Sequence, residues 1–330
     1  MPETFDSLPA TLRFQGAEVR RSPNGLTALL GRGTRVVLEC EGDGGLRAAE
    51  LAGPELQHAL VIALRAVFEW RPTTDALTVA LPSEIARDLA RGGFVELCAT
   101  RCVRGALAQH APLWLRAERA AEFPLRFTVS DGKRHPVRPE KPSGVVYERH
   151  VALLDSVLTL RTLDPERDLG HFHAWMNSPR IAPVWELQGS RADHRAYFER
   201  LERDPHTLPL IGEFDREPFG YFEIYWAKED RVAPFYAVDD YDRGLHVLVG
   251  EERFRGPQRV AAWLSGLAHY AFLDDPRTRT VVAEPRADNA RMIDYFEACG
   301  FHRQRTFHFP HKRAALMVLP REVFFEEHCP

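Results

Sequence analysis

The order of predicted elements in the C-terminal half constrains the fold of this chain more than any other feature. Residues 244–250, GLHVLVG, alternate as a strand, and residues 257–272 have the apolar content of a long helix. Residues 279–285, RTVVAEP, predict a second strand, and residues 288–300 predict a helix that starts at an Asp or Asn cap and ends on Gly300. This succession of strand, helix, strand and helix favours a mixed α/β unit.

Further elements flank that unit on both sides. Residues 147–163 predict strands, residues 166–179 and 192–205 predict helices, residues 208–226 predict a hairpin around DREP, and residues 301–310 and 313–320 predict a last hairpin.

The N-terminal half predicts a second α/β domain. At 330 residues the chain exceeds the usual size of one hydrophobic core. Asp131–Gly144, DGKRHPVRPEKPSG, is polar, Pro-rich and without hydrophobic period, as a surface connector would be. We therefore expect domains at 1–143 and 144–330. In the first, residues 56–70 predict a buried helix, residues 76–81 a buried strand and residues 82–93 a helix ending on glycine.

The two halves share an internal rhythm. A long apolar helix, a Pro/Thr linker, a short strand, a helix and a Gly–Phe ending occur in the same order in both, with Pro72 matching Pro276 and Phe94 matching Phe301. A duplicated domain and two unrelated α/β domains both produce such a rhythm, and identity between the halves is low. Both interpretations stay open.

Composition excludes several classes of partner. The net charge is -4, and no Lys/Arg block interleaves with aromatics, so we expect no nucleic acid partner. No apolar run approaches the roughly 20 residues of a membrane helix, and the N-terminus lacks the features of a secretory signal, so we expect a cytoplasmic protein without a membrane partner. The five cysteines are odd in number and scattered, which favours reduced thiols.

We expect no metal site. Cys98 and Cys102 form one spaced pair without a second Cys/His pair, and the His171 and His173 pair has no third ligand cluster.

The residues before the long helix are compatible with a plain loop or with a phosphate-binding loop. Arg253 and Gly256 stand directly before the long helix, and the free N–H groups and positive dipole end of a helix N-terminus attract phosphates. Pro257 removes one N–H but suits the first helical turn. Gln258 follows Pro257 in the first helical turn, at a position where the family described in the next paragraph usually has Gly or Ala.

With Asn289, Gly300 and Phe301 around the last helix, residues 145–320 resemble the GNAT acyl-CoA N-acyltransferase fold. That resemblance implies acetyl-CoA as co-substrate, and it implies a degenerate GNAT-like copy in the N-terminal half if the repeat is real. The family's tyrosine that protonates the CoA thiolate falls on Phe296. The implied CoA-binding residues are Leu248, Val249, Arg253, Arg255, Gly256, Gln258, Arg259 and Asn289.

Five ordered motifs carry a narrower resemblance: HFHAWMNSPRIAPVWE, FGYFEIYWAKED, DRGLHVLVG, FRGP and EPRADN. They resemble siderophore-biosynthesis acyltransferases of the aerobactin-type N6-hydroxylysine acetyltransferase family. The resemblance implies acetyl transfer to the hydroxylamine nitrogen of N6-hydroxylysine or a close analogue, which forms a hydroxamate. An N-hydroxylated amino acid or diamine is then the small-molecule partner, and siderophore-assembly enzymes can be further partners.

The same resemblance implies an active-site pair of His246 and Asp288. A hydroxylamine is largely neutral near pH 7, so positioning can supply roughly 7 to 11 kcal/mol of the barrier. A histidine with an ordinary pKa near ~6.5 suits removal of the proton lost as the hydroxamate forms. Without the resemblance, His246 could be a core histidine and Asp288 only a helix cap. The oxyanion is expected at a backbone N–H near residues 247–249.

The acceptor pocket is expected to draw on the HFHAWMN segment and on the strand facing His246. Core packing explains the tryptophans equally well. The predicted substrate-binding residues are His171, His173, Trp175, Asn177, Trp185, Glu223, Tyr225 and Trp226.

Two other functions stay open. Another GNAT acceptor, such as hydroxyornithine, a polyamine or a hydroxylated diamine, with an acetyl or succinyl donor, would fit the same motifs. A catalytically silent CoA-binding module is compatible with Phe296, Pro257 and Gln258.

Overall fold

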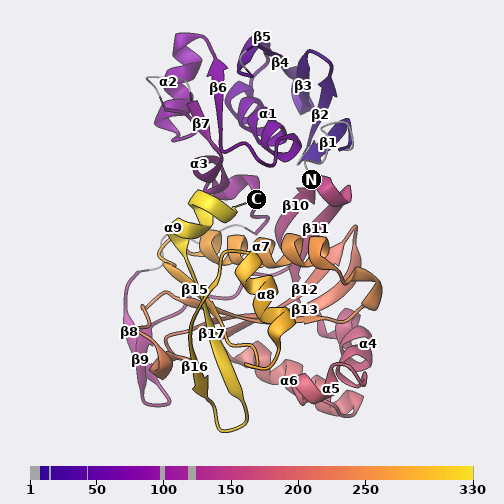
Figure 1. Ribbon diagram of the computed structural model, residues 1–330, viewed down its shortest axis with the longest axis vertical. Helices are drawn as coiled ribbons and strands as arrows, with labels where there is room; N and C mark the ends of the chain where they lie inside the picture. Colours follow the sequence, from indigo (N-terminus) through magenta and orange to yellow (C-terminus); the bar gives the residue numbers. More distant parts are fainter. Residues whose placement is uncertain (1–7, 15, 43, 97–100, 118–123, 330) are drawn as a thin grey trace. The chain divides into compact units, whose positions relative to one another are not determined.

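The chain forms two compact units in a computed structural model that describes residues 8–14, 16–42, 44–96, 101–117 and 124–329 (Figure 1). The first unit contains the chain up to Leu113, with His150–Ser156 and the residues from Phe325 onward; the second contains Trp114–Arg149 and Val157–Phe324. Each unit is therefore assembled from more than one stretch of the chain, whereas the sequence analysis placed one boundary between residues 143 and 144. Cys98 lies outside the described residues.

The first unit is built on a seven-stranded sheet in sequential order. Neighbouring strands are antiparallel except β5 and β6, which are parallel. The apolar helix α1 (Leu56–Trp70) packs on β2, β3 and β4 and is almost wholly buried. The strands are β1 (Thr11–Phe14), β2 (Ala17–Ser22), β3 (Gly25–Leu30), β4 (Thr34–Cys40), β5 (Leu46–Ala52), β6 (Ala76–Ala80) and β7 (Arg101–Val103), and the other helices are α2 (Ser83–Arg91) and α3 (Arg104–Ala108).

The second unit is built on an eight-stranded sheet in the order β10-β11-β12-β13-β14-β15-β17-β16. β14 and β15 form its parallel pair, joined by α7 (Pro257–Asp274). The strands are β10 (Val145–Val151), β11 (Ser156–Thr162), β12 (Thr207–Phe214), β13 (Glu217–Trp226), β14 (Arg243–Val249), β15 (Thr280–Ala283), β16 (His302–His308) and β17 (Arg313–Pro320). The other helices are α4 (Pro165–Met176), α5 (Ala182–Trp185), α6 (Arg191–Arg203), α8 (Ala290–Ala298) and α9 (Arg321–Val323).

Local sequence signals explain where these elements begin and end. Asp164 caps α4 ahead of Pro165, and Ser190 caps α6 in a capping box with Asp193. Asp215 and Arg216 turn the β12–β13 hairpin with φ of 51° and 68°. The predicted mixed α/β architecture in both parts of the chain is confirmed.

The polar segment 131–144 is not a free connector. Asp131 and Gly132 have φ of 50° and 77° and form the turn between β8 (Phe127–Ser130) and β9 (Lys133–Pro136). Arg138 is buried and binds both oxygens of the Glu229 carboxylate, at 2.7 and 2.6 Å. The segment therefore belongs to the second unit, because its turn joins β8 to β9 and its Arg138 binds Glu229 within that unit.

Among the described helices, none combines the length and apolar composition that crossing a membrane requires.

Candidate active site

The site lies where the two parallel strands of the second unit separate. β14 and β15 pair only from Arg243 to Leu245 on one strand and from Val281 to Ala283 on the other. β14 continues to Val249 without that neighbour. The next residue on each strand after the paired segment is His246 on β14 and Glu284 just past β15. Both therefore lie at the point of divergence.

His246 is held between two carboxylates from different strands. Its Nδ1 lies 2.8 Å from an oxygen of Glu223, and its Nε2 lies 2.8 Å from an oxygen of Glu284. Glu223 is directly opposite His246 in the β13–β14 register, so the pair shares one face of the sheet. The side chains of Glu284 and Glu223 are 0% and 7% exposed, whereas that of His246 is 22% exposed. The imidazole is thus the member of the trio that solvent or a substrate can reach.

Three tyrosines complete the hydrogen bonding of the two carboxylates. The hydroxyls of Tyr197 and Tyr221 donate to Glu223, the latter at 2.7 Å, and the hydroxyl of Tyr225 donates to Glu284 at 2.7 Å. Tyr221 and Tyr225 flank Glu223 at alternate positions of β13, which places all three on one face. The carboxylates are buried but well supplied with donors, as buried charges must be.

These contacts fix the charge of the site. Burial opposes the imidazolium, but the charge of Glu284 and the hydrogen bonds that the ring donates to both glutamates outweigh it and raise the pKa of His246 to about 10. Burial likewise opposes ionised Glu284, yet His246 lowers the pKa of that carboxyl to about 2. The pKa of Glu223 is also lowered, against its burial, mainly by His246. At neutral pH the trio is an imidazolium between two carboxylates, with a net charge of one negative unit.

This state differs from the expected proton acceptor with an ordinary histidine pKa. Both ring nitrogens of His246 are engaged by carboxylates, and the raised pKa favours the protonated ring at neutral pH. What the cluster offers is a buried excess of negative charge beside the one exposed ring. Such a preorganised charge favours positive charge that develops on a nearby nitrogen.

Asp288 is not the partner of His246. Its carboxylate pairs with Arg286, at 3.1 and 3.0 Å, and its side chain is 71% exposed. The neighbouring Asn289 caps α8 and accepts a hydrogen bond from the Met292 N–H. The acidic partner is instead Glu284, at the start of the same EPRADN segment.

The loop before α7 has the properties of an anion site. Gly256 adopts φ of 128° at the helix N-terminus, and no side chain caps the first turn, which contains no acidic residue. Arg253 and Arg255 are exposed and Arg259 is half-buried, and Arg253 pairs with Glu217 at 2.8 Å. Gln258 is exposed on the first turn. Free helical N–H groups surrounded by arginines fit a pyrophosphate.

The end of β14 is packed differently on its two sides. Leu248 belongs to a buried cluster beneath α4 and α6, and it pairs with Tyr221 across the β13–β14 ladder. The carbonyls of Val249 and Gly250 each accept a hydrogen bond from Arg180 at 2.8 Å.

Of the residues predicted to bind substrate, three lie together at the site. Glu223 contacts His246, the Tyr225 ring lies 4.7 Å from the imidazole, and the Trp185 ring lies 6.4 Å from it. Trp226 does not join them, because consecutive strand residues point to opposite faces. It lies between the guanidinium groups of Arg138 and Arg243.

The predicted residues of α4 have structural contacts. Trp175 is buried, donates to Glu251 at 2.9 Å and covers Gly250, where an added Cβ would lie 2.2 Å from its ring. Asn177 ends α4 and bonds the backbone of Gly189 in both directions. His173 contacts His194, whereas His171 is exposed beside Trp175.

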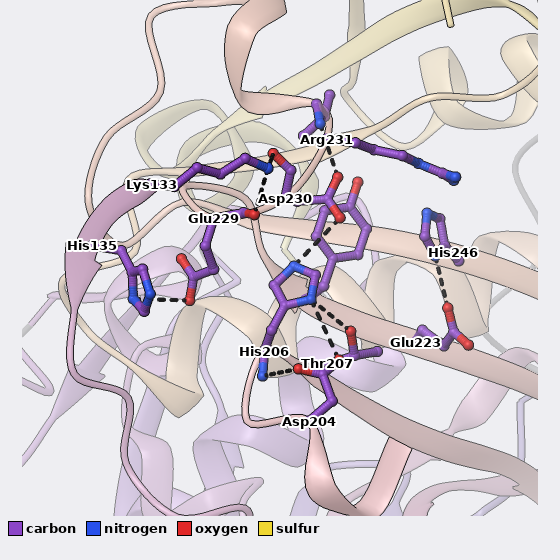
Figure 2. A network of polar contacts seen from close by, with 12 residues as sticks. Lys133, His135, Asp204, His206, Thr207, Glu223, Glu229, Asp230, Arg231 and His246 are labelled. Atoms are coloured by element: carbon purple, nitrogen blue, oxygen red, sulfur yellow. Dashed lines mark hydrogen bonds and ion pairs between the residues drawn. The ribbon is translucent and has the colours of Figure 1, made fainter. Parts of the chain in front are cut away.

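Sequence reasoning missed Glu284, Tyr197, Tyr221 and His206. His206 lies 3.6 Å from Asp204 and 3.4 Å from Asp230, beside the Tyr225 ring; Figure 2 shows this cluster next to Glu223 and His246. Burial opposes the charged ring, but the two aspartates raise the pKa of His206 to about 9. Parallel pairing of 244–250 with 279–285 would have placed Glu284 beside His246. The tyrosines carried no comparable sequence signal.

Within the described residues, no group of three or more His, Cys, Asp or Glu side chains has the arrangement of a metal site.

Comparisons with known proteins agree with this architecture. A family model described as an acetyltransferase (GNAT) domain matches residues 164–309. A solved structure of an uncharacterised protein from Bacillus halodurans is 29% identical, with a TM-score of 0.52, and the match covers 54% of this chain and 91% of that one.

Curated relatives are similar at a higher level of identity. The N(6)-hydroxylysine O-acetyltransferase of Escherichia coli is 42% identical over 66% of this chain and 69% of its own length. A hydroxyornithine transacylase of Ajellomyces capsulatus is 43% identical over 62% of this chain. An N(5)-hydroxyornithine:cis-anhydromevalonyl coenzyme A-N(5)-transacylase of Beauveria bassiana is 46% identical over 59% of this chain.

The chain spans 49% of the length of the Ajellomyces capsulatus relative and 44% of the length of the Beauveria bassiana relative. It spans 62% of the length of a third fungal relative. The match to the Escherichia coli relative extends over more than two thirds of that protein. The residues that match the GNAT family model include β13, β14, β15 and the site where β14 and β15 diverge. The chain therefore belongs to the GNAT superfamily, in the family of siderophore-biosynthesis acyltransferases.

Proposed function

We propose that this protein transfers an acetyl group from acetyl-CoA to the hydroxylamine nitrogen of N6-hydroxylysine or a close analogue. The observation that carries the proposal is the buried Glu223–His246–Glu284 cluster at the divergence of β14 and β15. The names of the relatives support an N-hydroxylated amino acid as acceptor.

The donor is proposed from the loop before α7. The free N–H groups of the first helical turn and the side chains of Arg253, Arg255 and Arg259 would hold the CoA pyrophosphate. From there the thioester would reach the gap between β14 and β15. Bound in this way, CoA supplies the activated acyl group, and the protein supplies its position.

The cluster would act through its charge. As the acceptor nitrogen attacks the thioester carbon, a C–N bond forms, the nitrogen gains positive charge and the C–S bond breaks. The net negative cluster at His246 favours that positive charge, since the carboxylates are already in place and need not reorganise. Overall, the nitrogen loses one proton and the departing thiolate gains one.

A thiol-release assay with acetyl-CoA tests the proposal. N6-hydroxylysine should release CoA and gain the mass of one acetyl group, whereas lysine should react much more slowly because its amine is protonated near pH 7. Absence of thiol release with N6-hydroxylysine and with hydroxyornithine would contradict the proposal.

The site of acylation needs its own measurement, because N-acetyl and O-acetyl products have the same mass. A hydroxamate chelates ferric iron through two oxygens and becomes coloured, which an O-acetyl hydroxylamine cannot do. A product that stays colourless with ferric iron would contradict transfer to nitrogen.

His246→Ala tests the cluster itself. It should lower turnover at least about tenfold, a minimum set below the roughly 10²- to 10³-fold cost of removing one preorganised group, with little change in the Kd of CoA. Unchanged turnover would remove His246 from the mechanism.

A further inference from the structure

Two cationic side chains converge on one aromatic ring beside the cluster. Arg231, in the segment between β13 and β14 (Figure 2), places its guanidinium carbon 5.1 Å from the centre of the Phe309 ring. Lys312, at the turn between β16 and β17, places its ammonium 5.6 Å from the same centre. Segments far apart in the sequence therefore deliver two positive charges to one place.

Glu284 connects these charges to His246. Its carboxylate binds the imidazole, while its backbone carbonyl accepts a hydrogen bond from the Lys312 ammonium at 2.7 Å. The Arg231 guanidinium lies 3.8 Å from the same carboxylate. Glu284 thus contacts both the histidine and the two cations.

Arg231 and Lys312 share this place with the Glu284 carboxylate, and Asp230 is a further acidic group that acts on Lys312. Glu284 already serves His246 and Tyr225, and the carbonyl that Lys312 contacts carries no net charge. Arg286, which is also nearby, is paired with Asp288. Burial lowers the pKa of Lys312 below its usual value, and Arg231 and Arg286 lower it further against the attraction of Glu284. An incoming anion would relieve this repulsion.

We propose that Arg231 and Lys312 bind the α-carboxylate of the acceptor, so that the site selects N-hydroxylated amino acids over the corresponding decarboxylated diamines. This inference rests on the proposed function. A carboxylate matches both donors: the arginine offers a planar fork and the lysine a point charge with unused N–H groups. The hydroxylamine end of the same molecule would then lie at His246.

The experiment compares N6-hydroxylysine with N-hydroxycadaverine, which has the same chain and the same nucleophile but no carboxylate. With the unaltered protein, kcat/KM should favour the amino acid by at least about tenfold. Lys312→Gln and Arg231→Gln should each reduce that preference by about tenfold, through the KM of the amino acid rather than through kcat. Lys312→Arg keeps the charge and should keep most of the preference.

Arg313→Gln is the matched control. It removes the same charge from the next residue of the same segment, where the side chain is exposed, and should leave the preference unchanged. The Kd of CoA should stay the same in all variants, which separates a carboxylate site from a phosphate site.

The two proposals fail in different ways. Turnover of both acceptors with equal kcat/KM by the unaltered protein would overturn the carboxylate site and leave the proposed function standing. An equal loss for both acceptors in Lys312→Gln and Arg231→Gln would also overturn it, because it would indicate a structural role. Absence of turnover with either acceptor would overturn the proposed function and this inference together.

Discussion

The two units of this protein have the same succession of elements around a parallel strand pair. In the first, β5, α1, β6, α2 and β7 follow one another, with β5 parallel to β6 and β7 antiparallel to β6. In the second, β14, α7, β15, α8 and β17 repeat that arrangement, with β16 inserted before β17. The shared order is the one expected of a duplicated unit, and it makes the differences between the units informative.

The largest difference lies in three side chains. Aligning TVALP of β6 with VVAEP of β15 places Leu81 at the position of Glu284. The strand registers then place Ala48 at the position of His246, and Leu38, its partner across the sheet, at the position of Glu223. The first unit thus has apolar side chains wherever the second has its charged cluster. A common scaffold does not confer chemistry, which depends on the residues placed on it.

The loops that precede the long helices α1 and α7 also differ in charge and length between the two units. Both contain Gly–Pro with a positive φ at the glycine, 102° at Gly53 and 128° at Gly256. In the first unit the connection is only Gly53–Glu55, and the acidic Glu55 occupies the N-cap of α1. In the second it is Gly250–Gly256, with two arginines. Only the second connection suits an anion.

Glu284→Leu converts the cluster toward the first unit and should have the largest effect. It leaves the imidazole Nε2 and the Tyr225 hydroxyl without their partner and removes the negative excess of the site. We expect acetyl transfer, measured by thiol release, to fall by at least about a hundredfold. The reverse exchange, Leu81→Glu, should change transfer less than about twofold. Equal losses of acetyl transfer in Glu284→Leu and Leu81→Glu would contradict the claim that only the charged cluster of the second unit supports the reaction.

The charge state of His246 gives the second prediction. With a pKa raised to about 10, the imidazolium should persist across pH 6 to 9, so the rate of acetyl transfer should show no step near 6.5.

The same pKa shifts affect the stability of the fold. The raised pKa of His246 stabilises the fold fully below about pH 6.5, which is the histidine pKa in the unfolded chain, and this contribution is lost as pH rises through about 10. The lowered pKa of Glu284 contributes above about pH 4.5 and is lost as pH falls through about 2.

An NMR titration of the histidine ring protons measures this directly, with His246→Ala to assign the signal. A titration midpoint near 6.5 for His246 would contradict the charged cluster and would indicate that His246 is an ordinary proton acceptor.

The third prediction concerns the two Gly–Pro connections. Gly256→Ala puts a Cβ on a residue with φ of 128°, which strains the loop, and the Kd of CoA should rise about tenfold. Gly53→Ala strains the first unit instead, where the new Cβ would lie 2.5 Å from the Thr34 Cα. It should lower the Tm without weakening CoA binding. Calorimetry of both variants checks this, and weaker CoA binding by Gly53→Ala would contradict the assignment of the phosphate loop.

Several of the helices and turns in this comparison could be predicted from the sequence, because hydrophobic periodicity and turn residues are signals that neighbouring residues carry. The helices at 56–70 and 257–272 and the hairpin turn at Asp215 lie where they were predicted. His246 was recognised from its strand and its motif. The five strands before residue 53 produced no specific prediction, since short amphipathic strands carry a weak signal.

What the sequence did not show depends on contacts between distant residues. Glu284 and Asp288 are four positions apart in one motif, and only the pairing of β15 with β14 decides which of them faces His246. Asp288 is instead taken by Arg286. Tyr225 and Trp226 are adjacent in sequence but on opposite faces of β13, so only one can line the site.

The last and smallest effect tests what the second unit has and the first lacks. In the second unit α4, α5 and α6 are inserted between β11 and β12, whereas β2 and β3 of the first unit are joined by a tight turn. Trp185 of α5 brings this insertion to the site, with its ring 5.6 Å from that of Tyr221 and 6.4 Å from that of His246. Losing one aromatic contact costs about 0.5–1.5 kcal/mol, so Trp185→Ala should raise the acceptor KM roughly two- to tenfold. The Kd of CoA should not change, and Val184→Ala, one residue earlier and 55% exposed, should have no effect. An unchanged acceptor KM in Trp185→Ala would mean that the inserted helices shape the fold and do not touch the acceptor, which would leave the charged cluster and the loop before α7 as the functional differences argued for the described parts of the two units.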